Sequence, residues 1–333
     1  MDRWLPVLLC SVISLAAGTV CAEPLLALLP GSVLLRLDSS DPSVILASVN
    51  ITGLYPAETL LAIDGRPATG QLYGLGNTSR LYLVNPVTGV SVQVGTGQFT
   101  PLLNGGSFGF DFNPVTDQIR VVSDLGQNLR VSPVTGIATI DAPLHGMVGN
   151  AVINSATGAA YSNNISGAAS TTLYVIDPVT DALYVQGSTG GSPSSPNDGV
   201  LNLVGSLTVD TTSAVGFDIS PSGTAYAAVK VNGLSSLWTV NLGTGALTQV
   251  GSFPPTAPTV NGLAAGVAIG CSLDVDGNGN LDALTDGLIM LRAMFGLTGT
   301  SVTTGVIGAG ATRSSWAQLQ AHLNGNCGTS FAP

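Results

Sequence analysis

Residues 108–142 read FGFDFNPVTDQIRVVSDLGQNLRVSPVTGIATIDA. Four short segments with large apolar residues alternate here with turns that contain Pro, Gly, Asn or Asp, the residues that supply the backbone angles of tight turns. The expected strands are 109–112, 118–123, 129–131 and 137–140. Four consecutive antiparallel strands in about 40 residues are typical of one blade of a β-propeller.

The turns of this blade recur along the chain in two series. The first turns are 64–70, 113–117, 154–158 and 220–223. The second turns are 85–89, 132–136, 177–181 and 241–245. In each series successive turns end 41–47 residues apart, except for a last step of 64–65. The agreement indicates a true repeat, and the long step indicates a surface loop inserted around Gly190–Gly199.

The two ends of the repeat region supply a fifth blade. Four units cover about 54–252, residues 260–267 fit an innermost strand, and residues 25–50 fit the outer strands of the same blade. Pairing these ends closes the ring and removes its exposed edges. We therefore expect a mainly β fold, a five-bladed β-propeller at 23–268 closed by N- and C-terminal strands. A six-bladed ring or an open array is the alternative.

The first 22 residues are typical of a signal peptide. The apolar run from Trp4 to Ala17 is too short to span a bilayer, and Val20 and Ala22 fit cleavage before Glu23. Lipidation at Cys21 is a weaker alternative. The sequence therefore predicts export, to a secreted, periplasmic or cell-surface location.

Composition narrows the function classes. The net charge of −10 does not change when residues 1–22 are removed, and it argues against nucleic-acid and anionic membrane partners. Only 8% of the residues are charged, while 43 Gly and 19 Pro favour an all-β body. The only histidines, His145 and His322, leave the propeller without a multi-His metal centre or a His-centred triad.

A separate small module is expected at residues 271–333. Residues 274–282 have the spacing of an EF-hand loop, with Asp at positions 1, 3 and 9, Asn at 5 and Gly at 6. Position 12 is Thr285, so a one-residue adjustment would make Asp286 the closing ligand. The predicted Ca²⁺ ligands are Asp274, Asp276, Asn278, Asn280, Asp282 and Asp286. A turn without an ion is the alternative.

Two helices and a disulfide are expected around this loop. The helix at 283–295 carries an apolar stripe of Leu284, Leu288, Leu291 and Phe295. The helix at 314–323 presents Trp316, Leu319 and Leu323. Cys271 and Cys327 are an even pair in an exported chain and are expected to be bonded to each other.

Two resemblances follow from these motifs. The run GFDFNPVTDQIRVVSDLGQNLRVSPVTG, with Leu173–Asp177 and Leu237–Asn241, resembles the bacterial family called domain of unknown function 4394 over about 25–268. This resemblance implies a secreted propeller-like domain and no assigned reaction. The C-terminal loop, with no helix entering it, resembles a dockerin-type half EF-hand. Dockerins generally carry two such loops, and residues 296–333 contain no second copy.

Two sets of polar residues in the propeller are candidates for chemistry. Asp64, Asp111 and Asp218 lie at or just before first turns, so we interpret them as turn caps; carboxylates paired in a propeller mouth for glycosidase or lyase chemistry are the less favoured alternative. The densest polar cluster is a possible ligand-contact rim, against the favoured alternative of a tight turn with a surface Arg. Its members are Asp124, Gln127, Asn128 and Arg130.

These observations favour an exported, non-enzymatic binding or scaffold protein. Its calcium-stabilised module would attach it to a protein or polysaccharide partner at the cell surface. The alternatives are a propeller enzyme of carbohydrate hydrolase, lyase or lactonase type acting at the central channel, and a purely structural surface-layer component. An enzyme needs several acids or a metal converging on the channel, whereas a scaffold's channel would be lined by small and apolar residues.

Overall fold

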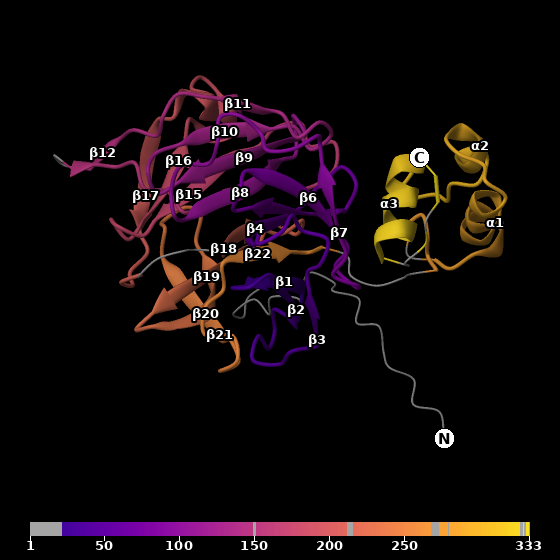
Figure 1. Ribbon diagram of the computed structural model, residues 1–333, viewed down its shortest axis with the longest axis horizontal. Helices are drawn as coiled ribbons and strands as arrows, with labels where there is room; N and C mark the ends of the chain where they lie inside the picture. Colours follow the sequence, from indigo (N-terminus) through magenta and orange to yellow (C-terminus); the bar gives the residue numbers. More distant parts are fainter. Residues whose placement is uncertain are drawn as a thin grey trace, which may run out of the picture.

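Five four-stranded antiparallel sheets are arranged around one axis in the computed structural model (Figure 1). This confirms the predicted mainly β, five-bladed propeller. The structure describes residues 22–148, 151–211, 216–267, 273–278, 280–326, 329 and 331–332. The predicted signal sequence, apart from Ala22, lies outside these residues, as do Cys271 and Cys327 of the predicted disulfide.

Four blades are built from consecutive strands. From inner to outer strand, the second blade is β4 (Leu60–Gly65), β5 (Leu72–Gly76), β6 (Arg80–Val84) and β7 (Ser91–Val94). The third blade is β8 (Phe108–Asn113), β9 (Gln118–Ser123), β10 (Asn128–Val131) and β11 (Ala138–Ile140). The fourth blade is β14 (Gly158–Tyr161), β15 (Leu173–Asp177), β16 (Ala182–Gln186) and β17 (Leu201–Ser206), and the fifth is β18 (Gly216–Ile219), β19 (Ala225–Val231), β20 (Leu234–Val240) and β21 (Leu247–Ser252). The strands of the third blade coincide with those expected from residues 108–142.

The first blade closes the ring with strands from both ends of the propeller. It contains β22 (Gly262–Ala265), β1 (Pro24–Leu29), β2 (Val33–Asp38) and β3 (Ala47–Asn50). β1 pairs antiparallel with β22, so that Leu25 lies opposite Ala265. The predicted closure is thus confirmed.

The fourth blade differs from the expected alignment. The turn at 154–158 precedes the innermost strand β14, not the second strand, and the turn at 177–181 joins the second and third strands. A short hairpin, β12 (Met147–Val148) and β13 (Ala151–Val152), precedes β14. The predicted insertion around Gly190–Gly199 lies between β16 and the outermost strand β17, and it contains η1 (Thr189–Gly191) and η2 (Pro196–Asp198). No residue of Gly190–Gly199 belongs to a strand, as expected for a surface loop.

The inner strands β4, β8, β14, β18 and β22 each contact the next around the axis, and β4, β18 and β22 lie near the centre of Figure 1. Small residues permit this approach. A Cβ atom at Gly109 would lie 2.8 Å from the Cβ of Ala159, and one at Gly216 would lie 2.9 Å from the main-chain nitrogen of Leu263. The space left between the strands is a cavity of about 10 Å³, roughly enough for one water molecule.

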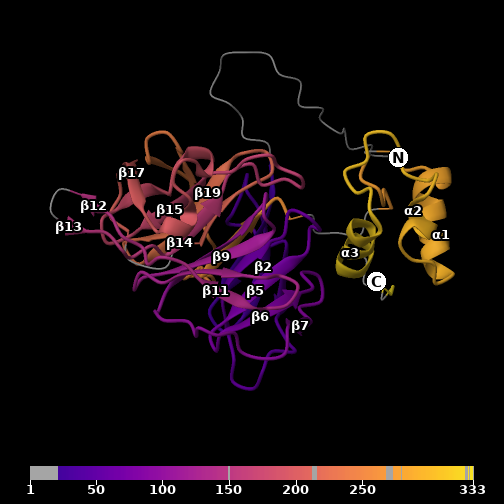
Figure 2. The same ribbon diagram turned by 90° about the horizontal axis from the view of Figure 1, so that it is seen from above.

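The C-terminal module lies beside the propeller as a small helical unit (Figure 1, Figure 2). Its elements are the π-helical turn η3 (Ala283–Gly287), α1 (Leu288–Met294), α2 (Thr300–Thr303) and α3 (Trp316–Asn326). Trp316, Leu319 and Leu323 are buried as expected.

The prediction that the apolar stripe of the first helix faces the core of the module is wrong. Leu284 is 79% exposed and Phe295 is 77% exposed, while Ile289 and Ala293 enter the core. For Leu284 the cause is the π turn η3, since the wider turn shifts residues before α1 out of phase with those inside it. Phe295 lies just after the last residue of α1.

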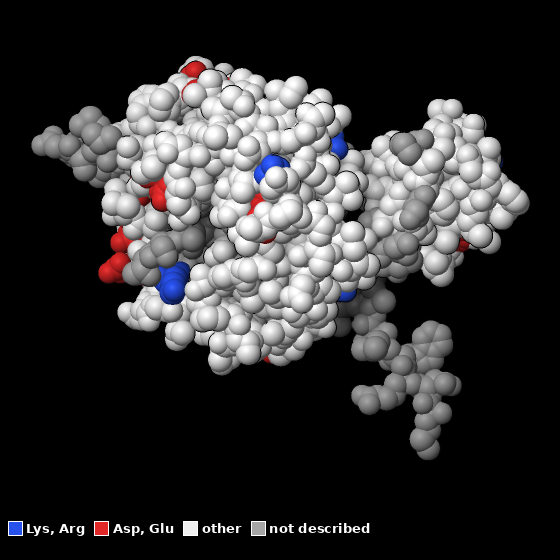
Figure 3. All heavy atoms as spheres, in the orientation of Figure 1, with Lys and Arg blue, Asp and Glu red and all other residues white. Residues whose placement is uncertain are grey.

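The surface carries little charge. The face in Figure 3 is mostly uncharged, with acidic and basic side chains scattered singly. None of the helices within the described ranges is long and apolar enough to cross a membrane.

Candidate functional site

Three aspartates from three blades meet at the propeller axis. Asp64 lies in β4, Asp111 in β8 and Asp218 in β18, and one carboxylate oxygen from each lies within 4.8 Å of the others. All three side chains are at most 1% exposed. The structure therefore brings together three residues that the sequence placed in separate turns.

Each of these carboxylates accepts a hydrogen bond from the main chain of the following blade. The amide of Phe112 donates to Asp64 over 2.8 Å, that of Tyr161 to Asp111 over 2.7 Å, and that of Ala265 to Asp218 over 2.6 Å. These bonds cross blade boundaries. The interpretation of the three aspartates as turn caps is therefore wrong, and they act as links between inner strands.

The axial carboxylates interact unfavourably when ionised. Burial, together with the charge of Asp218, raises the pKa of Asp64 well above its ordinary value. Burial and the two neighbouring carboxylates do the same to the pKa of Asp111. Burial raises the pKa of Asp218 to about 7. Placing three negative charges here requires protons or a cation to offset them.

A hollow of about 670 Å³ opens next to the axial carboxylates. Gly65, Asn164 and Ala265 line it, and each adjoins an axial aspartate: Gly65 follows Asp64, while Asn164 and Ala265 hydrogen-bond to Asp218. The hollow is continued by residues of the C-terminal module, including Thr312, Ser314 and Gln318. Small molecules and ions can thus approach the axis from this side.

A second cluster of carboxylates lies in the C-terminal loop. Asp274, Asp276 and Asp286 each offer an oxygen within 4.8 Å of the others, and Asp276 and Asp286 are buried. Three of the six predicted calcium ligands therefore converge. Asp286 also accepts hydrogen bonds from the amides of Val275 (2.6 Å) and Asp276 (3.1 Å), which fix its carboxylate against the loop.

The π turn explains why Asp286, and not Thr285, faces the loop. The amide of Gly287 donates to the carbonyl of Asp282, five residues back, over 3.2 Å. A π turn holds one residue more than an α turn. This extra residue is the adjustment that the sequence required for Asp286 to close the loop.

The other predicted ligands hold the loop in shape. Asp282 caps η3 by accepting from the amides of Leu284 and Thr285, and Asn278 accepts from the amide of Asn280 over 2.7 Å. Asn280 itself is exposed. The sequence did not identify Arg313, whose guanidinium donates to the carbonyls of Val275 (2.8 Å) and Asp274 (2.7 Å). Burial lowers the pKa of Arg313.

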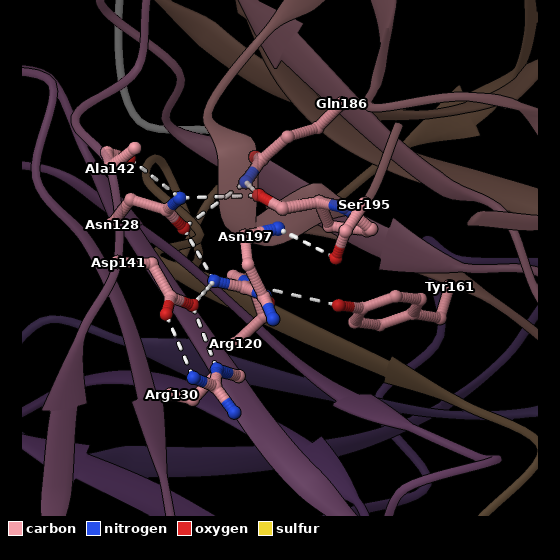
Figure 4. Close-up of polar contacts among 10 residues, drawn as sticks. Arg120, Asn128, Arg130, Asp141, Ala142, Tyr161, Gln186, Ser195 and Asn197 are labelled. Carbon is pink, nitrogen blue, oxygen red and sulfur yellow. Dashed lines mark hydrogen bonds and ion pairs between the residues drawn. The ribbon is translucent and has the colours of Figure 1, made fainter. Parts of the chain in front are cut away.

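A buried arginine holds the inserted segment against the third blade (Figure 4). Arg120 donates to Asn128 (2.6 Å), to Asp141 (2.7 Å) and to Asn197 (2.6 Å) in η2. Arg130 binds the same Asp141 through two hydrogen bonds. Burial opposes ionisation of Asp141, yet the hydrogen bonds from the two arginines keep its pKa below the ordinary value.

The predicted ligand rim is divided between two places. Asn128 and Arg130 belong to the network around Arg120, beside a cavity of about 110 Å³. Asp124 accepts from the amide of Gly106, and Gln127 bonds to the main chain of Asn104 and Leu102. Asp124 and Gln127 thus secure the loop before β8 and do not face the same cavity as Arg130.

The comparisons with known proteins identify the family. The model of the family described as Domain of unknown function (DUF4394) matches residues 33–264. The chain belongs to this family. The DUF4394 match begins in β2 and ends in β22, so it covers the propeller except for its first strand. No curated protein matches the sequence.

Several solved structures are similar to this DUF4394 chain. A protein of unknown function from Bacteroides thetaiotaomicron VPI-5482 has 15% identity and a TM-score of 0.41, over 68% of this chain and 57% of that one. The dihydro-heme d1 dehydrogenase NirN has 10% identity and a TM-score of 0.36, over 68% and 43%. A protein proposed to be a 6-phosphogluconolactonase, from Bacteroides uniformis ATCC 8492, has 15% identity and a TM-score of 0.37, over 72% and 83%.

Proposed function

We propose that this protein is an exported, non-enzymatic binding or scaffold protein whose C-terminal module is ordered by one calcium ion. The observation that carries the proposal is the convergence of Asp274, Asp276 and Asp286 in the loop. Hard oxygen ligands of this kind, alternating along a tight turn, are those that Ca²⁺ prefers. The dockerin-like, half EF-hand character of the loop is part of this proposal.

Calcium would stabilise a module with a small core of its own. The described core contains eight buried apolar side chains, so few apolar contacts oppose the repulsion among three carboxylates. They are Val275, Ile289, Ala293, Val302, Val306, Trp316, Leu319 and Leu323. An ion bound by these carboxylates stabilises the folded module and not the unfolded chain. Calcium removal should therefore unfold the module selectively.

The exposed apolar side chains of the module support a role in attachment to a protein. Leu284, Leu291, Met294 and Phe295 are all exposed around η3 and α1. Clustered exposed apolar residues are typical of a protein-binding surface, whereas polysaccharide sites rely more on polar groups and flat aromatic rings. We infer that the partner is a protein at the cell surface.

The enzyme alternative has weaker support. Three acids converge on the axis, as a hydrolase or lyase would require, but each is at most 1% exposed. They therefore present almost no surface to a substrate in the adjoining hollow of about 670 Å³. The carboxylates instead bond to main-chain amides of neighbouring blades.

The test is calcium binding by the chain from Glu23 to Pro333, measured by titration calorimetry after chelator treatment. Its tryptophans, Trp238 in β20 and Trp316 in α3, report separately on propeller and module. In a Trp238→Phe background, calcium should raise the unfolding temperature reported by Trp316, and Asp276→Asn should abolish this shift. Asp210→Asn, the same change at an exposed site, is the control. A module that unfolds at one temperature with and without calcium contradicts the proposal.

A further inference from the structure

No hydrogen bond or ion pair given for the described part of the chain joins an axial carboxylate to a cationic side chain. The hydrogen bonds and ion pairs of the described residues connect Asp64, Asp111 and Asp218 to main-chain amides and to the side-chain amide of Asn164, but to no Lys, Arg or His. This contrasts with Asp141, which is paired with two arginines. Buried charges in proteins are normally paired or coordinate a metal ion.

Within the described ranges, two buried oxygens at this site accept no hydrogen bond from an amide, hydroxyl or cationic group. One is Oδ1 of Asp111, whose other oxygen accepts from Tyr161; the carboxyl group of Asp111 can otherwise share only a proton with that of Asp64. The second belongs to a neutral side chain: Asn164 is 6% exposed, and its Nδ2 donates to the carbonyl of Ile219 (2.9 Å) and to Asp218 (3.4 Å), while its Oδ1 has no partner. Buried oxygens without donors are costly unless an unseen ligand satisfies them.

We propose that the propeller axis binds one hard divalent cation through the carboxylates of Asp64, Asp111 and Asp218. Oxygens bound to one Ca²⁺ at 2.3–2.6 Å lie up to roughly 5 Å apart, and the axial oxygens lie within 4.8 Å of one another. Asn164 adjoins the site through its Nδ2, 3.4 Å from Asp218, and rotation of this side-chain amide would offer its unpartnered oxygen as a fourth ligand of the same hard class. The remaining positions are filled by water from the adjoining hollow.

This cation links inner strands of three blades that are far apart in the sequence. Its three ligands come from the second, third and fifth blades. The first and fourth blades have an alanine, Ala264 and Ala160, in place of the aspartate. Each alanine immediately precedes a residue, Ala265 or Tyr161, whose main-chain amide donates to an axial carboxylate. The ion thus supports the ring from its centre, and its loss leaves three carboxylates in mutual repulsion.

The experiment counts ions in the mature chain and in two single variants. Each protein is exported in calcium-containing medium, freed of loose metal and analysed by mass spectrometry for bound Ca²⁺, Mg²⁺ and Mn²⁺. Asp111→Asn keeps the shape of the axial site and removes one charge, Asp276→Asn alters the C-terminal loop, and Asp210→Asn is the exposed control. We expect two ions in the mature chain and in the control, and one in each of the other variants.

Propeller unfolding provides a second measurement, in a Trp316→Phe background in which Trp238 alone reports. EDTA should lower the unfolding temperature by roughly 5–10 °C if the cation is present at about 100 times its dissociation constant. Added CaCl₂ should restore it. In Asp111→Asn the EDTA effect should be absent, whereas Asp276→Asn should retain it.

The experiment distinguishes failure of the axial-cation proposal from failure of the proposal that calcium binds the C-terminal loop. If Asp111→Asn holds as many ions as the mature chain and EDTA does not change propeller unfolding, the axial carboxylates are protonated and the axial cation is refuted, whatever the loop binds. If Asp276→Asn loses no ion while Asp111→Asn loses one, the calcium loop is refuted and the axial site stands.

Discussion

The main-chain amide of Phe112 donates a hydrogen bond of 2.8 Å to the carboxylate of Asp64, although the two residues belong to different blades. The same relationship links Tyr161 to Asp111 and Ala265 to Asp218. Antiparallel pairing holds each blade together, while these bonds hold adjacent blades to one another. The side chain of one inner strand thus satisfies a buried main-chain donor of the next.

Substitutions of Asp64 separate its role as a hydrogen-bond acceptor from the effect of its negative charge. Asp64→Ala removes the acceptor of the Phe112 amide and should lower the free energy of unfolding by about 1–3 kcal/mol. Asp64→Asn keeps an oxygen acceptor and removes a buried charge, so in EDTA it should unfold at or above the temperature of the natural protein. Denaturant unfolding measures the first effect and thermal unfolding the second, each with and without calcium. Equal destabilisation by the two variants in EDTA would show that an oxygen acceptor alone does not replace the carboxylate.

Close approach of the inner strands makes Gly109 sensitive to any added side chain. Its new Cβ in Gly109→Ala would lie 2.8 Å from both the Cβ and the nitrogen of Ala159. We expect a loss of about 1–3 kcal/mol from the free energy of unfolding. Gly97→Ala, where nothing lies within 4 Å, is the matched control and should change stability little. Similar losses at both sites would argue against tight packing at the axis.

Removing the Arg120 guanidinium should release the inserted segment. Arg120→Met leaves Asn197 and part of Asp141 without donors, at a cost of about 3–5 kcal/mol. Limited proteolysis with a non-specific protease, followed by mass spectrometry, should show faster cleavage within residues 188–199. Arg130→Met, at a half-exposed site, should cost about 1 kcal/mol and leave the cleavage rate unchanged. Equal cleavage in both variants would contradict the role of Arg120.

The ion pairs of Asp141 predict a dependence on pH. The arginines lower the pKa of the Asp141 carboxyl in the folded protein. The ionised carboxyl therefore contributes to the free energy of unfolding above the pKa of the unfolded chain, about 3.9, and this contribution is lost as the pH falls through the pKa of the folded protein. Asp141→Asn should therefore be less stable than the natural protein by about 3 kcal/mol at pH 7. The difference should narrow below about pH 4. Urea unfolding across this range measures it, and a constant difference would oppose the assignment.

The π turn predicts which residue closes the calcium loop. Asp286→Asn should weaken calcium binding by at least about tenfold, since it removes a charged ligand. Thr285→Ala, at the usual closing position, should leave the affinity nearly unchanged because the carboxylate that joins Asp274 and Asp276 belongs to Asp286. Calcium titration calorimetry on the two variants shows whether residue 285 or residue 286 supplies the closing ligand. A larger loss in Thr285→Ala would place the closing ligand at Thr285.

Local signals made the blades predictable. Turns such as Asn113–Asp117 and Ser132–Gly136 contain the residues that tight turns require, so their spacing revealed the repeat. The fourth blade was misaligned because its turns at 154–158 and 177–181 have the usual composition but join different strands of the sheet. Strand order depends on contacts between segments that are distant in the sequence, and turn composition does not report it.

The axial site was hidden for a related reason. Asp64, Asp111 and Asp218 are 47 or more residues apart and come together only when the ring closes. A signal was present: in each case a small residue, Ala62, Gly109 or Gly216, stands two positions before the aspartate. The C-terminal cluster of Asp274, Asp276 and Asp286 was easier to predict because its members are close in sequence, although the π turn that brings in Asp286 has no local signature.

The pairing of β1 with β22 has a consequence for the order of events during synthesis. β1 is made long before its partner, because the strand that covers its inner edge ends at Ala265. Until then β1 presents unsatisfied main-chain groups, a state that invites mispairing with other chains. Closure of the ring is therefore one of the last steps of folding, and a chain that stops before Gly262 leaves this edge of β1 unpaired.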